Sequence, residues 1–361
     1  MQKLLPWLGL AILLTGCTVL RAGDCPPNCV GVSLRNRDLS RVDWNHISLN
    51  RAMLQRANLS YANLSYTNLN SADLSGSQLY GANLRGADLT NANLKSAILV
   101  GADLTAANLS GADLTGAALT GVRLESAQLT AAILTNVRML NVNLSGARLT
   151  GNQLSGAQLT GVNLSRADLS GANLAGAILY ATDLRAADLR GANLQDARLE
   201  GARMDDIRLS GANLTDAAID GSALPRADLS GARLLNAGVT GCDLTDANLS
   251  RAYLAGAFFS GAVLLGANMS QANFADVVRG SAGDTFYAAT LDGAMLIGAN
   301  LTNANLAGVA LNGADLNDAD LSGAILTRTF TINGKPVVKT ADLRDALFNA
   351  GTKFPQGFKP Q

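Results

Sequence analysis

The sequence predicts an all-β solenoid built from five-residue units, and three observations carry this prediction. An apolar residue, usually leucine, recurs at every fifth position from Leu34 to Phe274, about 49 times in succession. The residue two positions earlier is usually alanine, as in Ala62-Asn63-Leu64. Aromatic residues make up only 4% of the chain, so a layered globular core would lack large side chains. A period of five fits neither a helix nor an ordinary strand.

The first residues have the features of an export signal. Lys3 precedes an apolar run at 4–14 that is too short to cross a bilayer as a helix. The run ends in Leu14-Thr15-Gly16-Cys17, which resembles the lipobox of bacterial lipoprotein signal peptides. The resemblance implies a signal peptide at 1–16 and a lipid on Cys17 that anchors the chain to a membrane. Ordinary cleavage near residues 22–23 is the alternative, and in both cases we expect export.

Residues 17–33 are predicted to form a lipid-anchored N-terminal segment and cap. In an oxidising compartment Cys25 and Cys29 are candidates for a disulfide. The two prolines between them stiffen this small loop, so free thiols remain the alternative. Cys242 stands where the repeat usually has alanine, and we interpret it as a small buried apolar residue.

The repeat itself, predicted at 34–276, reads Ala-(Asp/Asn)-Leu-x-x and resembles the pentapeptide repeat family. The resemblance implies a right-handed quadrilateral β-helix with four pentapeptides per coil and about 14 coils, in which leucine and alanine point inward. The residues agree, because a small and a large apolar side chain fill a narrow interior. Glycine is the commonest last residue of a unit, as at Gly81 and Gly86, and it suits turns that require positive φ.

The register is interrupted twice after Phe274. Residues 277–288 are predicted to be a loop insertion, after which the β-helix continues at 289–328. Residues 329–340 are predicted to be a β-hairpin insertion, because Asn333-Gly334 lies between β-forming residues. Residues 341–361 are predicted to be a repeat remnant and a cap, and their ending is similar to that of cyanobacterial family members.

No pattern of catalytic, cofactor-binding or metal-ligating residues is found in the sequence. His46, the only histidine, has no positioned carboxylate or nucleophile near it in the sequence. The aspartates before the central leucines follow the repeat and need no metal to explain them. The formal net charge of zero argues against a nucleic-acid partner. We therefore expect no enzyme, no cofactor and no nucleic-acid binding.

One outer face has a regular column of hydroxyl groups at a spacing of 20 residues, which we call the hydroxyl ladder. Its members are Thr90, Ser110, Thr130, Thr150, Ser170, Ser210, Ser230, Ser250 and Ser270, with Arg190 as an interruption. If four units make one coil, these hydroxyls lie in a row that could accept a protein or a glycan. Serine and threonine are also usual at this position of the repeat, so a purely structural role is the alternative.

Together these features predict a non-catalytic, lipid-anchored scaffold of the bacterial cell envelope, on the periplasmic side of the inner or the outer membrane. Its partners would be the membrane, through Cys17, and an unidentified protein or glycan, with monomer and homodimer both open. The alternative function is a nucleic-acid mimic or topoisomerase-protection protein, which resembles the role of some family members. Zero charge and the export signal disfavour it.

Overall fold

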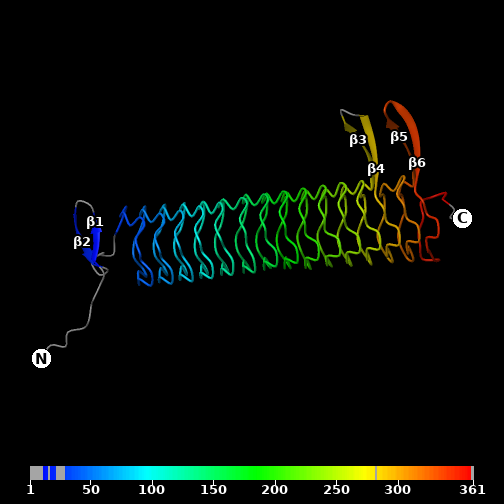
Figure 1. Ribbon diagram of the computed structural model, residues 1–361. Coiled ribbons are helices and arrows are strands. Elements are labelled where there is room, and N and C mark those ends of the chain that lie inside the picture. Colours follow the sequence, from blue (N-terminus) through cyan, green and yellow to red (C-terminus); the bar gives the residue numbers. More distant parts are fainter. Residues whose placement is uncertain (1–10, 15–16, 22–28, 281–282, 359–361) are drawn as a thin grey trace. The chain divides into compact units, whose positions relative to one another are not determined.

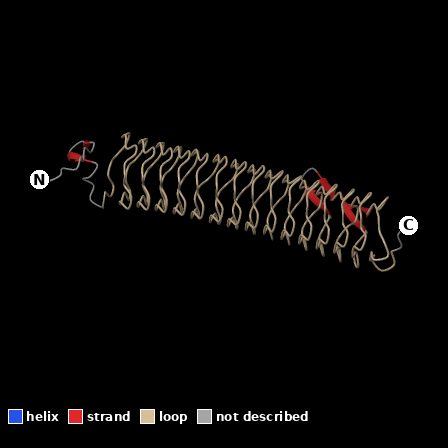
Figure 2. Cartoon of the chain, turned by 90° about the horizontal axis from the view of Figure 1, so that it is seen from below, coloured by secondary structure: helices blue, strands red, loops and turns tan. Residues whose placement is uncertain are grey.

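The computed structural model describes residues 11–14, 17–21, 29–280 and 283–358. The chain divides into two compact units, Met1–Arg138 and Met139–Gln361. The described residues contain no helix; their strands form two-stranded antiparallel sheets joined by turns and isolated bridges (Figures 1 and 2). The strands are β1 (Ala11–Leu14), β2 (Cys17–Arg21), β3 (Ala275–Gly280), β4 (Gly283–Ala288), β5 (Thr327–Ile332) and β6 (Lys335–Thr340).

The repeats of the first unit stack through parallel backbone bridges. Asn63 pairs with Asn83, and Asn83 pairs with Asp103, so each pentapeptide lies beside the one four units later. The backbone N–H of Leu64 donates to the carbonyl of Asn83 at 2.7 Å. Leu64 and its equivalents Leu84 and Leu104 are at most 1% exposed. Burying each leucine stabilises the stack by roughly 1.5–3 kcal/mol.

The second unit repeats this pairing. Asn193 pairs with Asn213, and the backbone N–H of Leu194 donates to the carbonyl of Asn213 at 2.7 Å. Where β3 and β4 interrupt the repeat, the partner of Asn268 is Asn300, which is 32 residues away. The bridges continue on both sides of the insertion, so the insertion leaves the stacking of the repeats intact.

Each pentapeptide closes with a tight turn that requires positive φ at its last residue. At one such turn the carbonyl of Leu104 accepts the N–H of Ala107 at 3.0 Å, across Thr105 and Ala106. Ala106 has a φ of 57°, which is the left-handed value required at the third residue of a type II turn. Glycine adopts this conformation without strain, which explains its frequency at the last position of the pentapeptide. We call this position the corner.

A few polar residues replace the inward alanine and are accommodated by backbone acceptors. The hydroxyl of Thr67 donates to the carbonyl of Trp44 at 2.7 Å, and Ser222 donates to Leu199 at 2.8 Å. Cys242 is buried in the same way, with its thiol 2.9 Å from the carbonyl of Ile219. Asn152 is fully buried with no partner for its side-chain amide among the described residues, and nothing in the structure explains it.

The segment predicted to be a loop at 277–288 is instead a β-hairpin. β3 and β4 pair antiparallel from Ala275↔Ala288 to Gly280↔Gly283. The physical reason lies in the residues flanking the turn, since Val277-Val278 and Thr285-Phe286-Tyr287 are strong β-formers. β5 and β6 form a second hairpin, at 327–340, which turns at Asn333 and Gly334 with φ of 50° and 73°.

The array ends in a cluster of aromatic rings. Asp342 and Lys353 continue the parallel bridges by pairing with Ala310 and Asp320. The ring of Phe354 lies 5.4 Å from that of Phe348 and 5.3 Å from that of Phe358, measured between centroids. The β5–β6 hairpin projects sideways from the array (Figure 1).

Candidate interaction surfaces

The outward side chains of the repeat form the same hydrogen bonds in turn after turn. The Asp or Asn before the central leucine accepts the backbone N–H of the residue two positions later, as Asp113 does from Thr115 at 3.0 Å. The hydroxyl of Thr115 donates to the same carboxylate oxygen at 2.6 Å. Burial raises the pKa of Asp113, but the hydrogen bonds from Thr115 and the Lys95 ammonium outweigh it and lower the pKa. The aspartates therefore have a structural role in the fold.

The hydroxyl ladder takes part in these turns. In the first unit Thr90 and Ser110 donate their hydroxyls to Asp88 and Asn108, while Thr130 is exposed. In the second unit Thr150 and Ser170 both donate to Asp168, at 2.9 and 2.7 Å. The remaining members, Ser210, Ser230, Ser250 and Ser270, are half-buried. Several ladder hydroxyls are thus already used as donors, which limits what they offer to a partner.

Amide side chains link successive coils along the faces. In the second unit Asn213 donates to Asn193 at 3.0 Å, and Asn193 donates to Asn173 at 3.1 Å. Asn300 donates to Asn268 at 3.2 Å across the insertion of β3–β4. Each amide both donates and accepts in such a row, so these rows stabilise the stack and hold its outer faces rigid.

The two hairpins of the second unit pack against each other, and the sequence did not predict this contact. The rings of Phe286 in β4 and Phe330 in β5 meet edge to face with centroids 4.9 Å apart. The ammonium of Lys339 lies 4.6 Å from the centre of the Phe286 ring. A Cβ on Gly308, at a corner of the repeat, would lie 2.8 Å from Cζ of Phe286, and the φ of 81° at this position also favours glycine. Figures 1 and 2 both show the hairpins side by side.

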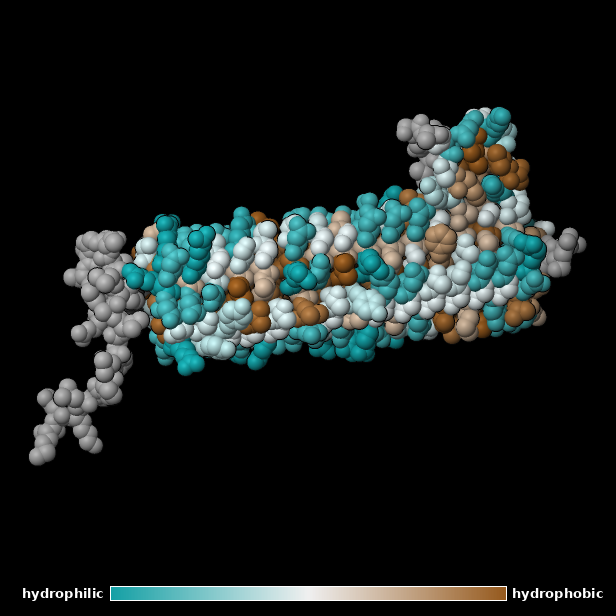
Figure 3. All heavy atoms as spheres, in the orientation of Figure 1, coloured by the Kyte–Doolittle hydropathy of each residue, from teal (hydrophilic) through white to brown (hydrophobic). Residues whose placement is uncertain are grey.

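The hairpin tips are joined by reciprocal hydrogen bonds. The N–H of Asp284 donates to the Asn333 side chain at 2.8 Å, and the N–H of Asn333 donates to the Asp284 carboxylate at 2.9 Å. The outer face of β5–β6 carries exposed Thr329, Thr331 and Val338, of which Val338 is 64% exposed. Apolar surface gathers on the projecting hairpins in Figure 3. The pair therefore presents a rigid, partly apolar ribbon to solvent.

A tyrosine fixes the base of the first hairpin to the array. The hydroxyl of Tyr253 lies 3.2 Å from the carboxylate of Asp276 in β3, and the Arg233 guanidinium lies over its ring at 5.2 Å. Burial, together with the charge of Asp276, raises the pKa of Tyr253 to about 12. The tyrosine therefore remains neutral and donates to Asp276 across the whole physiological range.

The predicted cysteine sites fall at the edge of the described residues. Cys17 begins β2, and Leu14 pairs with Cys17 in the antiparallel β1–β2 sheet. Cys29 is part of a disulfide, whereas its predicted partner Cys25 lies outside the described residues. The pairing of Cys25 with Cys29 therefore stays a prediction. Burial raises the pKa of the free Cys242 thiol to about 12, so it is a poor nucleophile.

The remaining sequence candidates do not form a chemical site in the described part of the chain. His46 is exposed and stacks on Tyr66, with ring centroids 5.1 Å apart. No group of three or more His, Cys, Asp or Glu side chains able to hold a metal ion occurs among the described residues. The same residues include no helix capable of spanning a bilayer.

Comparisons with known proteins agree with the repeat. No curated protein matches the chain. Among solved structures, HetL from the cyanobacterium Nostoc, a pentapeptide repeat protein involved in regulating heterocyst differentiation, is 27% identical, covering 82% of this chain and 92% of its own (TM-score 0.21). A pentapeptide repeat protein from the thylakoid lumen of Arabidopsis thaliana is 36% identical, covering 32% and 70% (TM-score 0.14). Rfr23 from the cyanobacterium Cyanothece is 26% identical, covering 37% and 63% (TM-score 0.15).

The family assignment rests on the sequence match and not on these superpositions. The family model of pentapeptide repeats matches overlapping or adjoining segments from 28–60 to 242–278, and a further segment at 286–329. These segments cover most of the chain and include both units of the structure. The chain therefore belongs to the pentapeptide repeat family.

Proposed function

We propose that this protein is a non-catalytic lipoprotein of the bacterial cell envelope, whose repeat array is a rigid scaffold that presents a binding surface for a protein or a glycan. The fold we propose for the array is the right-handed quadrilateral β-helix of about 14 coils. Processing before Cys17 would remove β1, place a lipid on the new N-terminus and leave the array tethered to the membrane.

One observation carries this proposal, namely that the interior of the repeat is filled. Central leucines and preceding alanines such as Ala82 and Leu84 are fully buried, so the array offers its outer faces for recognition. The paired hairpins add a projecting ribbon on which Val338 is exposed. The zero net charge counts against a nucleic-acid mimic as the alternative.

Metabolic labelling with a fatty acid tests the tether. We expect label on the wild-type chain, which stays with membranes through a high-salt wash, and neither label nor salt-resistant membrane retention for Cys17→Ala. Cys242→Ala is the matched control, since it removes a buried thiol outside the lipobox and should keep both label and location. Salt-resistant membrane retention of Cys17→Ala, or an unlabelled wild type, would contradict the tether.

A further inference from the structure

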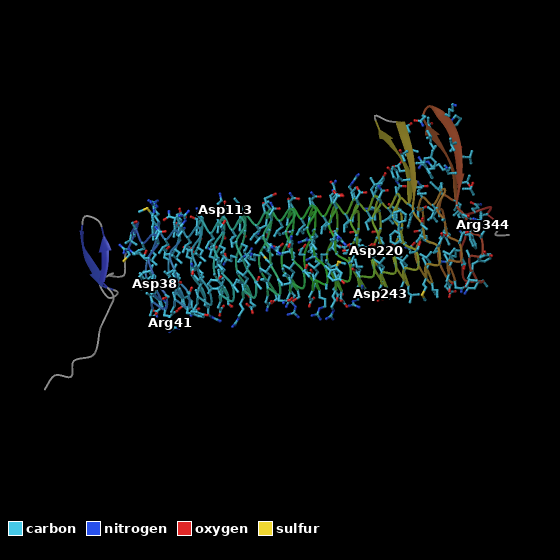
Figure 4. The ribbon with its side chains drawn as sticks, viewed as in Figure 1. Asp38, Arg41, Asp113, Asp220, Asp243 and Arg344 are labelled. Carbon is cyan, nitrogen blue, oxygen red and sulfur yellow. The ribbon has the colours of Figure 1, made fainter. Side chains whose placement is uncertain are left out.

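The first coils of the array have basic residues at their corners. Three corners of one coil are Arg41, Arg51 and Arg56, with φ of 59°, 58° and 56°, and we call these residues the corner ring. The fourth corner is His46. All three arginines are exposed, and Figure 4 shows Arg41 at the N-terminal end of the repeats. The corners of the next coil carry Tyr61, Tyr66, Ser71 and Gly76.

The fold does not require arginine at these corners. A left-handed backbone strains every residue with a Cβ, and Gly81 and Gly101 occupy the equivalent corners of later coils on the Arg41 side. Glycine forms the same turn with less backbone strain than arginine. The turn does not account for these charges, and the corner ring differs from single corner arginines such as Arg166 because three of the four corners of one coil carry arginine.

These positive charges also have few acidic partners within the protein. None of the ion pairs found among the described residues includes Arg41, Arg51 or Arg56. Residues 29–60 contain five arginines but only two acidic residues, Asp38 and Asp43. From residue 61 onward the balance reverses, with 21 Lys and Arg against 25 Asp and Glu. Positive charge is thus concentrated in the first coils.

One of these corners borders a groove suited to an anion. The groove has a volume of about 370 Å³ and is lined by Arg35, Asn36, Gln55, Arg56 and Ser75. The Nε of Arg35 donates to the side chain of Gln55 at 2.9 Å, which holds one guanidinium at the groove. The guanidinium groups of Arg35 and Arg56 match the oxygens of a phosphate-type headgroup. The amide of Gln55 and the hydroxyl of Ser75 already bond the carboxylate of Asp73.

We propose that the corner ring and this groove rest on the anionic headgroups of the membrane that holds the lipid of Cys17, an inference that rests on the proposed function. The three arginines lie at different corners of one coil, so only an end-on approach brings them all to a flat surface. Cys17 precedes Cys29 by about 12 residues, a tether that spans at most about 40 Å. Tyr61 and Tyr66, both exposed one coil further on, suit the membrane interface.

Vesicle sedimentation of the mature chain from residue 17 onward, carrying Cys17→Ser and therefore free of both lipid and signal peptide, tests the corner ring. We expect binding to phosphatidylcholine vesicles that contain phosphatidylglycerol, and none to pure phosphatidylcholine. The triple variant Arg41→Gly, Arg51→Gly, Arg56→Gly should weaken binding by about 100-fold, since each arginine near such a surface contributes roughly five-fold. Glycine suits these corners, so this variant should fold.

The control variant Arg166→Gly, Arg226→Gly, Arg251→Gly removes equal charge from positive-φ corners of the second unit, with φ of 57–59°. It should bind within about two-fold of the parent, because its changes lie far along the sequence from the corner ring. Equal loss in the two triple variants, or binding to neutral vesicles, would overturn the proposal. Competition by inorganic phosphate at constant ionic strength would also overturn it, by assigning the groove to a free anion.

The outcomes separate this inference from the tether. If Cys17 is labelled in cells but the lipid-free chain does not bind anionic vesicles, the corner ring fails and the tether stands. If the lipid-free chain binds but Cys17 is never labelled, the tether fails, and the corner ring stands as a peripheral membrane contact.

Discussion

The last residue of each unit, the corner, has positive φ. The backbone strain of this conformation determines how a substitution at a corner changes the free energy of unfolding. In the described repeats many corners are glycines with positive φ, but many others are occupied by residues that carry a Cβ, among them Ala106, Ala131 and Ala181. A corner alanine is exposed and strained, whereas the alanine that follows it is buried and packed. Neighbouring alanines in the sequence therefore have opposite roles.

Ala106 and Ala107 make this contrast testable. Ala106→Gly relieves left-handed strain and should stabilise the array by about 0.5–1 kcal/mol. Ala107→Gly removes the same methyl group from a fully buried position and should destabilise by about 1–2 kcal/mol. The measurement is the urea midpoint of each variant followed by circular dichroism. Shifts in the same direction would show that the corner conformation does not control stability.

At the scale of the element, the paired hairpins are held at both ends. Asp284 and Asn333 join their tips, the rings of Phe286 and Phe330 meet between them, and Tyr253 ties β3 to the array. Side chains from three separate stretches of the chain thus fix the direction in which the ribbon projects. A ribbon held in this way is pre-organised to bind a partner.

Tyr253 gives this element a pH signature. Its pKa is raised from 10.0 to about 12 in the folded protein, by burial first and by Asp276 second, so the folded state keeps a proton that the unfolded chain loses. The stability that depends on this proton is complete below about pH 10 and is lost as the pH rises to about 12. In a titration of tyrosine absorbance, the difference between wild type and Tyr253→Phe should report a group that ionises near pH 12. Asp276→Asn should lower that pKa, and an unchanged value would show that the carboxylate does not act on the tyrosine.

At the scale of the whole molecule, carboxylates recur in the turns. Because the pKa values of several of these carboxylates are lowered by folding, they make the stability of the protein depend on pH in the acid range. The pKa of Asp168 is lowered because hydrogen bonds from Ser170 and Thr150 outweigh burial, which acts in the opposite direction. The pKa of Asp320 falls to about 2 through hydrogen bonds from Ser322 and Lys353. Lys353 belongs to the last coil, 2.9 Å from Asp320, so this pair also holds the end of the array.

Acid should therefore unfold the protein through many small contributions. Each folded pKa lies below the unfolded value of 3.8, so the stabilisation is present above about pH 4 and is lost as the pH falls toward about 2. The urea midpoint should decrease over this interval. Lys353→Met should reduce the part of the decrease that comes from Asp320. A midpoint that is constant from about pH 4 to about pH 2 would contradict the proposed role of the turn carboxylates.

The amino-acid order alone dictated the five-residue unit, the inward leucine and alanine and the positive-φ corner, because each depends on residues close together in the chain. Leu64 and Gly81 could be assigned their roles without coordinates. The hydroxyl ladder could also be placed, but not the fact that Thr90 and Ser170 already donate to aspartates, since side-chain hydrogen bonds are not visible in a repeat pattern.

The contacts outside the repeat required the folded chain. Phe286 meets Phe330, and Arg35 comes to the same groove as Arg56, because stacking brings together residues that are separated by one or more whole coils. The β3–β4 hairpin was predicted to be a loop because the five-residue pattern stops where the hairpin begins. A periodic sequence fixes its own local geometry, whereas the sites that break the period are defined by which coils become neighbours.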